Sequence, residues 1–205
     1  PVDEQDFSTI SRKRWGTMPM AALVIQRLLE RIASERVTIS AFGLREGVVF
    51  DHAPERFRQS DPLIEFCLDA AEKRSRFPAH GDSLMHWIDP LFPVESPRQN
   101  RLRYALCLLS DIGWNGHPEY RAEFAMDQVL LSQLSGIDHA GRAFISLGLF
   151  VINGGALTSP SAEVARALLD DEDLILVRKV GLALRLGQRI SGGTRELLDH
   201  IELAT

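Results

Sequence analysis

Cysteine is scarce in this sequence of 205 residues. The two that occur, Cys67 and Cys107, lie inside the apolar segments FCLDAA and YALCLL, and neither belongs to a CxxC pair or a zinc-type cluster. A disulfide-stabilised scaffold and a cysteine–zinc module are therefore excluded. We expect two buried, reduced thiols that behave as small hydrophobic side chains, with a disulfide between them as the alternative.

Long apolar runs and an excess of positive charge are also missing. Charge or glycine interrupts every hydrophobic stretch before it reaches the roughly 20 residues that cross a bilayer, and the chain does not open on a basic-then-apolar stretch. The formal net charge of −5 at pH 7 and the pI of about 5.7 give no bulk attraction for nucleic acid or anionic lipid, although a local basic patch could bind a polyanion. We expect a cytoplasmic protein with neither membrane nor nucleic acid as a partner, and the opening PVDEQDF is typical of a cut inside a longer protein.

Helical periodicity dominates what is present. Apolar residues recur at helical spacing over 17–35, followed by the β-branched run Val37–Ser40, which predicts a strand, and by a short helix over LREGVVFDHA. One strand between two helices cannot form a sheet, so its partner strands must come from outside this segment. After residue 60 the pattern predicts only helices, at about 63–76, 79–91, 99–111, 118–135, 139–152, 160–170, 172–190 and 195–203.

The segment VTISAFGLREGVVFD, residues 37–51, follows a helix that contains KRWGTMPMAALVIQRLLE. It resembles the signature that closes the second lobe of the exopolyphosphatase/guanosine-pentaphosphate phosphatase (Ppx/GppA) family, where a strand leads into Gly-Leu-Arg-Glu-Gly, matched here by residues 43–47. The resemblance implies that residues 1–58 are the C-terminal fragment of the second actin/hexokinase-like (ASKHA) phosphatase lobe. This short α/β remnant would precede a chain that is mainly α.

A second resemblance covers the helical remainder. The stretches HGDSLMHWIDPLF, residues 80–92, and RLRYALCLLSDIG, residues 101–113, are similar to the histidine helix and the His-Asp helix of the HD-like domain that follows in longer members of the family. The resemblance implies an all-α HD-like domain over 59–205. In a working HD domain, histidine and aspartate side chains from these helices hold a divalent metal, because imidazole and carboxylate are good ligands for such cations.

Two of the four expected metal ligands are missing. The dyad reads Ser110-Asp111, and the later helix has Gly187-Gln188-Arg189 where a closing aspartate is expected. Only His80 and Asp111 remain, and a two-ligand remnant beside a guanidinium should bind metal feebly. We therefore expect no functional metal centre in this chain.

The resemblance places catalysis elsewhere. Family members look like two-lobed phosphotransfer proteins that cradle phosphates in Gly-rich loops and position water with a carboxylate. The glycine pairs of this chain, Gly154-Gly155 and Gly192-Gly193, follow no predicted strand. We expect no catalytic residue and no cofactor here. The loops, the carboxylate and the Mg²⁺ that the intact parent enzyme needs are expected in the lobes upstream of Pro1.

A polyphosphate groove needs several cations along one path. The resemblance places Arg45 and Glu46 at the border of the phosphate cleft, with an ion pair that caps a helix as the alternative. Arginine-rich helix ends on either side of His80 predict a cationic ridge or, alternatively, solvated faces. The segment RKVGLALRLGQR is a third basic element, and its glycines would let another helix approach closely, within the domain or between subunits. The substrate-binding candidates are Arg45, Glu46, Arg74, Arg76, Arg101 and Arg103.

Together these features predict a non-catalytic accessory part of an exopolyphosphatase or pppGpp phosphohydrolase, the parent of which removes terminal phosphate from polyphosphate. The expected partners are polyphosphate or pppGpp, the missing N-terminal lobes, and a second copy in a homodimer. One alternative is a metal-dependent HD-type phosphohydrolase that uses His80 and Asp111. The other is a purely structural dimerisation module.

Overall fold

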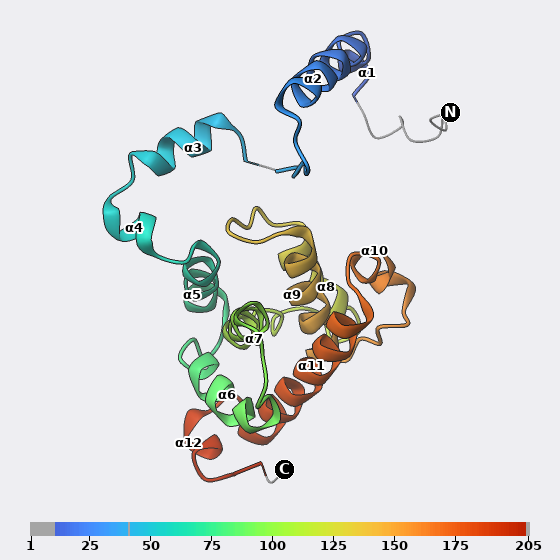
Figure 1. Ribbon diagram of the computed structural model, residues 1–205. Helices are drawn as coiled ribbons and strands as arrows, with labels where there is room; N and C mark the ends of the chain where they lie inside the picture. Colours follow the sequence, from blue (N-terminus) through green and yellow to red (C-terminus); the bar gives the residue numbers. More distant parts are fainter. Residues whose placement is uncertain (1–10, 41, 204–205) are drawn as a thin grey trace. The chain divides into compact units, whose positions relative to one another are not determined.

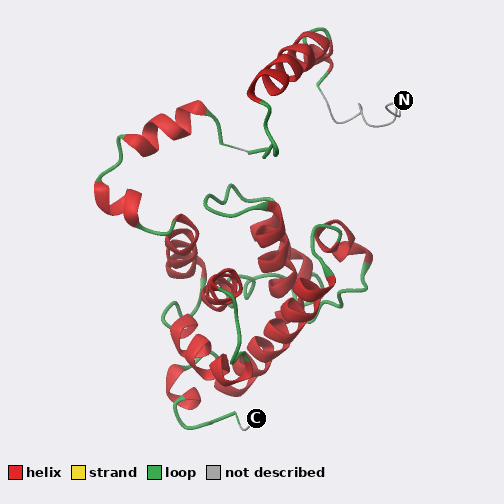
Figure 2. Cartoon of the chain, in the orientation of Figure 1, coloured by secondary structure: helices red, strands yellow, loops and turns green. Residues whose placement is uncertain are grey.

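The structure is a computed structural model, in which residues 11–40 and 42–203 are described, apart from the side chain of Arg195 (Figure 1). Over these residues every regular element is a helix (Figure 2). The chain divides into two compact units, with the boundary between Val48 and Val49, and each unit is described by itself. The first ten residues of the predicted lobe fragment lie outside the described part.

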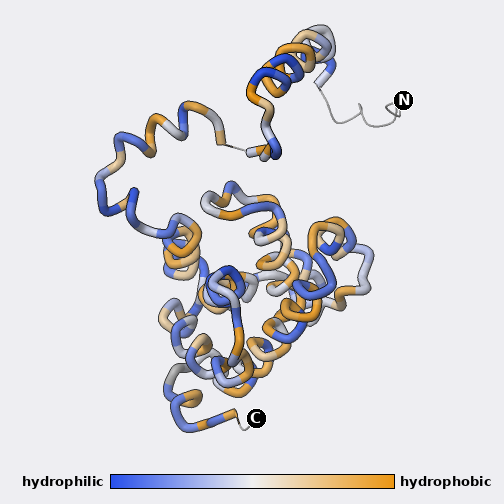
Figure 3. The backbone as a smooth tube through the Cα atoms, in the orientation of Figure 1, coloured by the Kyte–Doolittle hydropathy of each residue, from blue (hydrophilic) through white to orange (hydrophobic). Residues whose placement is uncertain are grey.

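The first unit contains α1 (Arg12–Trp15) and α2 (Met18–Ile32), and α3 (Leu44–Asp51) begins within it. Helix α2 has a proline in its first turn and ends at Ala33, whose φ of 51° is left-handed. Hydrophobic and hydrophilic residues alternate along α2 in Figure 3. Its apolar side chains, among them Ile25 and Leu28, remain about half exposed. The periodicity therefore predicted the helix correctly, but no core forms against it in the described residues.

The prediction of a strand at Val37–Ser40 is wrong for the structure as described, and the α/β remnant stays a prediction, because the partner strands were expected from outside this segment. The segment is coil. A strand needs a neighbour that accepts and donates its backbone hydrogen bonds, and no described residue of this chain supplies one. The following motif instead opens α3, where the backbone N–H of Gly43 donates to the Glu46 carboxylate at 2.7 Å.

The second unit is built around α9 (His139–Ile152), most of whose side chains are buried. Helix α9 packs against α8 (Arg121–Leu130), α11 (Asp171–Ser191), α7 (Pro97–Leu109) and α10 (Glu163–Arg166), as Figure 1 shows. The remaining elements are α4 (Glu55–Gln59), α5 (Pro62–Arg74), α6 (His80–Ile88), η2 (Asp89–Leu91), η3 (Pro160–Ala162) and α12 (Arg195–Leu198).

Short polar side chains start the main helices of this unit. Asp61 accepts hydrogen bonds from the backbone of α5, Asp138 from that of α9 and Asp170 from that of α11. Ser96 and Gln99 form a reciprocal capping box at the start of α7. Such caps satisfy backbone donors that have no partner within the helix, and each stabilises its helix by about 1 kcal/mol.

Glycines allow the helices to approach one another closely. A Cβ on Gly81 would lie 2.9 Å from the backbone Cα of Leu108, and a Cβ on Gly181 would lie 2.7 Å from the Cβ of Val151. The glycines of the basic segment RKVGLALRLGQR therefore do form a packing seam. This seam lies inside the unit, between α11 and α9 at Gly181 and between α11 and α6 at Gly187, which faces Leu84.

Most helices after residue 60 are confirmed, and three are markedly shorter than predicted, the first being α8, which spans Arg121–Leu130 rather than 118–135. The segment 160–170 forms only the 3₁₀ turn η3 and the four-residue α10, and the last helix ends at Leu198 rather than near 203. Cys67 and Cys107 are both free and buried, as expected. In the part of the chain that the structure describes, no helix is both long enough and apolar enough to span a bilayer.

Candidate functional site

Asp111, at the C-terminal end of α7, is bound by Arg76 from the loop between α5 and α6. The backbone N–H of Arg76 donates to Oδ2 at 2.8 Å, and the guanidinium donates to Oδ1 through Nη2 at 2.5 Å and through Nε at 3.1 Å. Asp111 is 8% exposed, so this carboxylate has left water and depends on Arg76 for its hydrogen bonds. The same contact raises the pKa of Arg76.

His80, the first residue of α6, is buried and lies 3.0 Å from the Oγ of Ser191 through its Nε2. The Ser191 hydroxyl donates to the carbonyl of Gly187 at 2.8 Å, so its oxygen is left to accept. Nε2 therefore carries the imidazole proton and donates to Ser191. Nδ1 has no partner among the described residues. Burial lowers the pKa of His80, and the nearby Asp111 charge opposes this in part.

Ser110 and Gln188 face each other across α7 and α11. The Gln188 Nε2 donates to the Ser110 Oγ at 2.9 Å, and that hydroxyl donates in turn to the Cys107 carbonyl at 2.8 Å. A closing aspartate was expected at Gly187-Gln188-Arg189. Of these three residues, Gln188 is the one whose side chain contacts Ser110. A neutral amide–hydroxyl pair stands where the resemblance would place metal ligands.

These residues do not fit a divalent metal ion. A cation would have to displace the Arg76 guanidinium from Asp111, and the guanidinium would repel it. His80 uses its protonated Nε2 on Ser191 and keeps only Nδ1 as a possible ligand atom, and Ser110 offers only a hydroxyl, which is a poor ligand. Over residues 11–40 and 42–203 there is no group of three or more histidine, cysteine, aspartate or glutamate residues that could hold a metal.

A cationic pocket of about 210 Å³ lies beside the Arg76–Asp111 and Ser110–Gln188 contacts. Four arginines and a single aspartate line it, which leaves a formal excess of three positive charges. Its walls come from the end of α7, the start of α8, the end of α9 and the C-terminal half of α11. The lining residues are Arg76, Ser110, Asp111, Trp114, Arg121, Ile152, Asn153, Arg185, Gln188 and Arg189.

Of the predicted substrate-binding residues, Arg76 is the one that lines this pocket. Arg103 is 1% exposed and is bound by Glu95 and Asp89, with Nη2 to the Glu95 Oε2 at 2.6 Å. Arg101 pairs with Asp61 at 2.5 Å. Both side chains are held by internal carboxylates, so their geometry favours a structural role, and a role in substrate binding stays a prediction.

The other candidates are more exposed. Arg74 donates to the Gln128 side chain at 2.9 Å. Glu46 caps α3 through Gly43, which matches the capping half of the alternative, and no ion pair joins it to Arg45 in the structure as described. Arg45 is exposed on α3, and a role for either residue at a phosphate cleft stays a prediction.

The arginines that sequence reasoning missed as ligand-binding candidates are Arg121, Arg185 and Arg189. A signal for two of them was present, because the basic segment RKVGLALRLGQR places Arg185 and Arg189 four residues apart, on one face of a helix. Nothing in the sequence could pair them with Arg121, since that juxtaposition depends on how α8 and α11 pack on α9.

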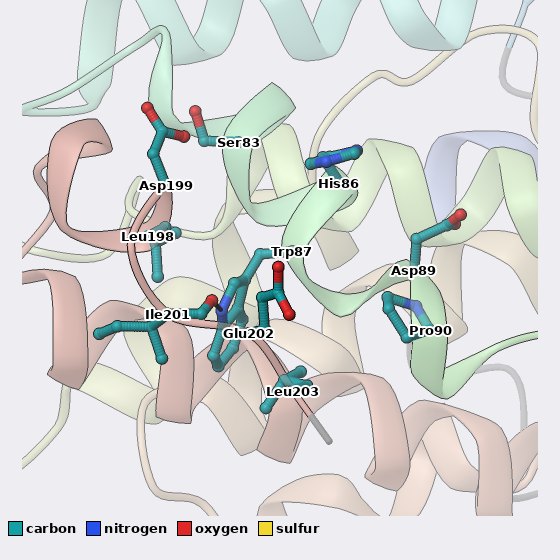
Figure 4. A pocket seen from close by; sticks show the side chains of 10 residues that line it. All are labelled: Ser83, His86, Trp87, Asp89, Pro90, Leu198, Asp199, Ile201, Glu202 and Leu203. Atoms are coloured by element: carbon teal, nitrogen blue, oxygen red, sulfur yellow. Dashed lines mark hydrogen bonds between the residues drawn. The ribbon is translucent and has the colours of Figure 1, made fainter. Parts of the chain in front are cut away.

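A larger hollow of about 410 Å³ lies between α6 and the C-terminal segment, and Figure 4 shows its ten lining side chains. Trp87 connects the two walls of this hollow, because its Nε1 donates a hydrogen bond to the Ile201 carbonyl at 2.7 Å. Its acidic side chains are Asp89, Asp199 and Glu202, and no lysine or arginine is among its lining residues. A third hollow, between α5 and α6, is also lined by carboxylates, including Glu65, Asp69 and Asp82. Neither hollow suits an anion.

Comparison with known proteins agrees with this architecture. A search of curated proteins gave no match. The sequence model of the family described as "Exopolyphosphatase, C-terminal" matches residues 63–205, which is most of the chain and begins in the first turn of α5. The all-α unit that carries the cationic pocket is thus the matched region, and the chain belongs to the exopolyphosphatase C-terminal domain family.

Proposed function

We propose that this chain is a non-catalytic accessory part of an exopolyphosphatase or pppGpp phosphohydrolase, which extends the surface that binds a polyanionic substrate and supports dimerisation. The observation that carries the proposal is the contact between Arg76 and Asp111. The contact holds, in an internal ion pair, the carboxylate that the HD resemblance would offer to a metal, and it does so in a domain of the exopolyphosphatase C-terminal family.

Hydrolysis of a phosphoanhydride bond needs a group that activates water and a group that neutralises the developing charge. Asp111 is the buried carboxylate nearest the cationic pocket, and its oxygens already accept hydrogen bonds from Arg76. It is therefore a poor general base. In the proposal, water activation and Mg²⁺ binding belong to the N-terminal lobes of the parent protein, which would also be partners of this chain.

The test of inactivity is release of phosphate from long-chain polyphosphate and from pppGpp by the 205-residue chain. We expect no turnover with Mg²⁺ or Mn²⁺ and none after chelation. Turnover that requires Mn²⁺ and disappears in Asp111→Ala would favour an HD-type phosphohydrolase instead. Turnover that persists after removal of metal would contradict both hypotheses.

The test of the accessory role is binding. Polyphosphate should bind the chain with an affinity that falls as salt rises, because neutralisation of phosphates by arginine releases counterions. Light scattering at the same protein concentrations would show whether the chain forms the expected dimer. A chain that binds neither polyphosphate nor pppGpp at low salt, but dimerises, would be a structural module.

A further inference from the structure

We propose that the cationic pocket is a phosphoryl-binding site, in which Arg121, Arg185 and Arg189 hold the oxygens of one phosphate group. The choice of a phosphoryl group as the anion rests on the proposed function, whereas the existence of an anion site rests on the pocket itself. Two sources share this chemistry, free orthophosphate and a phosphoryl unit of polyphosphate.

Of the four arginines that line this pocket, only Arg76 has a carboxylate partner among the described residues. Arg76, Arg98, Arg101 and Arg103 each pair with a carboxylate. By contrast, no carboxylate of the described residues pairs with Arg185, Arg189 or Arg121. Like charges gathered around a hollow repel one another, and an anion between them relieves that repulsion.

The three arginines converge from two helices. Arg185 and Arg189 lie one turn apart on the same face of α11, about 6 Å along its axis. Arg121 is the first residue of α8, where the helix dipole also favours negative charge. Its Nε donates to the Gly116 carbonyl at 3.2 Å, which fixes the guanidinium while leaving both Nη atoms for a ligand. Planar guanidinium forks match the oxygens of a phosphoryl group.

Local backbone geometry makes room for one of these guanidinium groups. Gly154, just after α9, has a φ of 99°, and a Cβ at this position would lie 3.2 Å from the Arg185 Nη2. Arg185 therefore lies over a glycine whose conformation a side chain would strain. The volume of about 210 Å³ is below the roughly 300–1,000 Å³ of pockets for drug-sized ligands, which is consistent with a small anion.

Arg76 also lines the pocket, but its charge is balanced by that of Asp111. Its guanidinium is neutralised by Asp111 and lies near the Trp114 ring, with Cζ 5.8 Å from the centroid. Because the Asp111 carboxylate is bound by the Arg76 guanidinium, its negative charge is already compensated. An incoming phosphoryl group meets three unpaired guanidinium groups and one carboxylate that is already compensated.

The test uses the double variant Arg185→Gln/Arg189→Gln, and Arg189→Gln alone in case the double variant is less stable. Arg178→Gln is the matched control, because Arg178 is exposed on the same helix and does not line the pocket. Calorimetric titration with orthophosphate and with tripolyphosphate, at one salt concentration, measures the two sources separately. Circular dichroism checks that each variant remains helical.

We expect wild type and Arg178→Gln to bind at least one of the two anions, and the double variant to bind it about tenfold or more weakly, since each lost contact is a charge-assisted hydrogen bond. Arg189→Gln should show a smaller loss. Loss of orthophosphate binding assigns the site to the free ion, and loss of tripolyphosphate binding alone assigns it to the polymer.

The remaining outcomes separate this inference from the proposed function. Orthophosphate binding that depends on Arg185 and Arg189, without any binding of tripolyphosphate, supports the site and contradicts the polyanion role. Tripolyphosphate binding that both glutamine variants retain supports the polyanion role and overturns the site. Absence of binding by wild type overturns both.

Discussion

Both oxygens of the Asp111 carboxylate are bound by Arg76, one by its guanidinium at 2.5 Å and the other by its backbone N–H at 2.8 Å. Two residues 35 positions apart thereby connect the α5–α6 loop to the end of α7. The contact engages the carboxylate that the resemblance would offer to a metal, and because the pair is neutral, the positive surplus of the adjoining pocket comes from Arg121, Arg185 and Arg189.

Arg76→Ala should lower the free energy of unfolding by about 1–3 kcal/mol, because it leaves a buried carboxylate with only the backbone N–H as its partner. The effect should fall at the lower end, since the Arg76 side chain is itself partly exposed and screened by water. Urea unfolding of Arg76→Ala, Asp111→Asn and the double variant measures the coupling. A coupling energy of zero would show that the ion pair contributes nothing.

The buried His80 should make the free energy of unfolding fall as the pH drops below about 6.5. Burial lowers its pKa in the folded state, so the folded chain resists a proton that the unfolded chain accepts as the pH falls below the ordinary histidine value. Its stabilising effect is therefore complete above about 6.5 and is lost as the pH falls toward the folded pKa. A proton on Nδ1 would also be buried without an acceptor among the described residues.

Urea unfolding at pH 7.5 and 5.5 checks this expectation. The difference in unfolding free energy between the two pH values should shrink in His80→Gln and persist in His86→Gln, a change at a less buried position on the same helix. An unchanged difference in His80→Gln would assign the pH dependence to other groups.

Gly81→Ala should destabilise the unit by about 1–3 kcal/mol through overpacking. The new Cβ would meet the Leu108 backbone, which no change of rotamer can move. Gly47→Ala, in α3, is the control, because a Cβ at that position would meet no neighbouring atom of the described residues within 4 Å and alanine favours a helix by up to about 1 kcal/mol. Equal melting temperatures for the two variants would contradict the close approach of α6 and α7.

Glu95→Ala should cost about 3 kcal/mol, because it leaves the Arg103 guanidinium buried with Asp89 as its remaining carboxylate. Arg27→Ala is the comparison, since it removes an exposed ion pair with Glu30 in α2 and such pairs contribute at most about 1 kcal/mol. Chemical unfolding gives both values. If both variants unfold alike, the contacts of Arg103 with Glu95 and Asp89 do not have the structural role inferred from the burial of Arg103.

Helix positions could be predicted from the sequence because periodicity and capping are local. The apolar pattern and the stop at Asn153 fixed α9, and Asp61-Pro62 fixed the start of α5. The strand at Val37–Ser40 failed for a non-local reason, since β-branched residues favour an extended backbone but a strand exists only beside another. The segment 160–170 forms only η3 and the four-residue α10, and nothing in its local pattern explains the early end of the helix.

The pocket could be predicted only in part. The sequence shows Ser110 and Gly187-Gln188-Arg189 at the places where the HD resemblance would expect two metal ligands. Whether an arginine is free or paired is not visible, because its carboxylate partner can lie far away in the sequence. Arg103 lies close to Glu95 in the sequence, but its place among other arginines predicts an exposed cationic ridge. The segment that contains Arg185 and Arg189 predicts a packing seam instead. Their roles follow from burial and from the neighbours that tertiary packing supplies.

Asp61 is connected at once to the first turn of α5, through the backbone N–H groups of Leu63 and Ile64, and to Arg101 of α7. The family match begins at residue 63, two positions beyond this carboxylate. A truncation that starts at the match would leave α5 uncapped and Arg101 without its counterion. Anyone who isolates the helical unit for expression should therefore cut before Asp61, since the thermodynamic edge of the domain lies upstream of its sequence-defined edge.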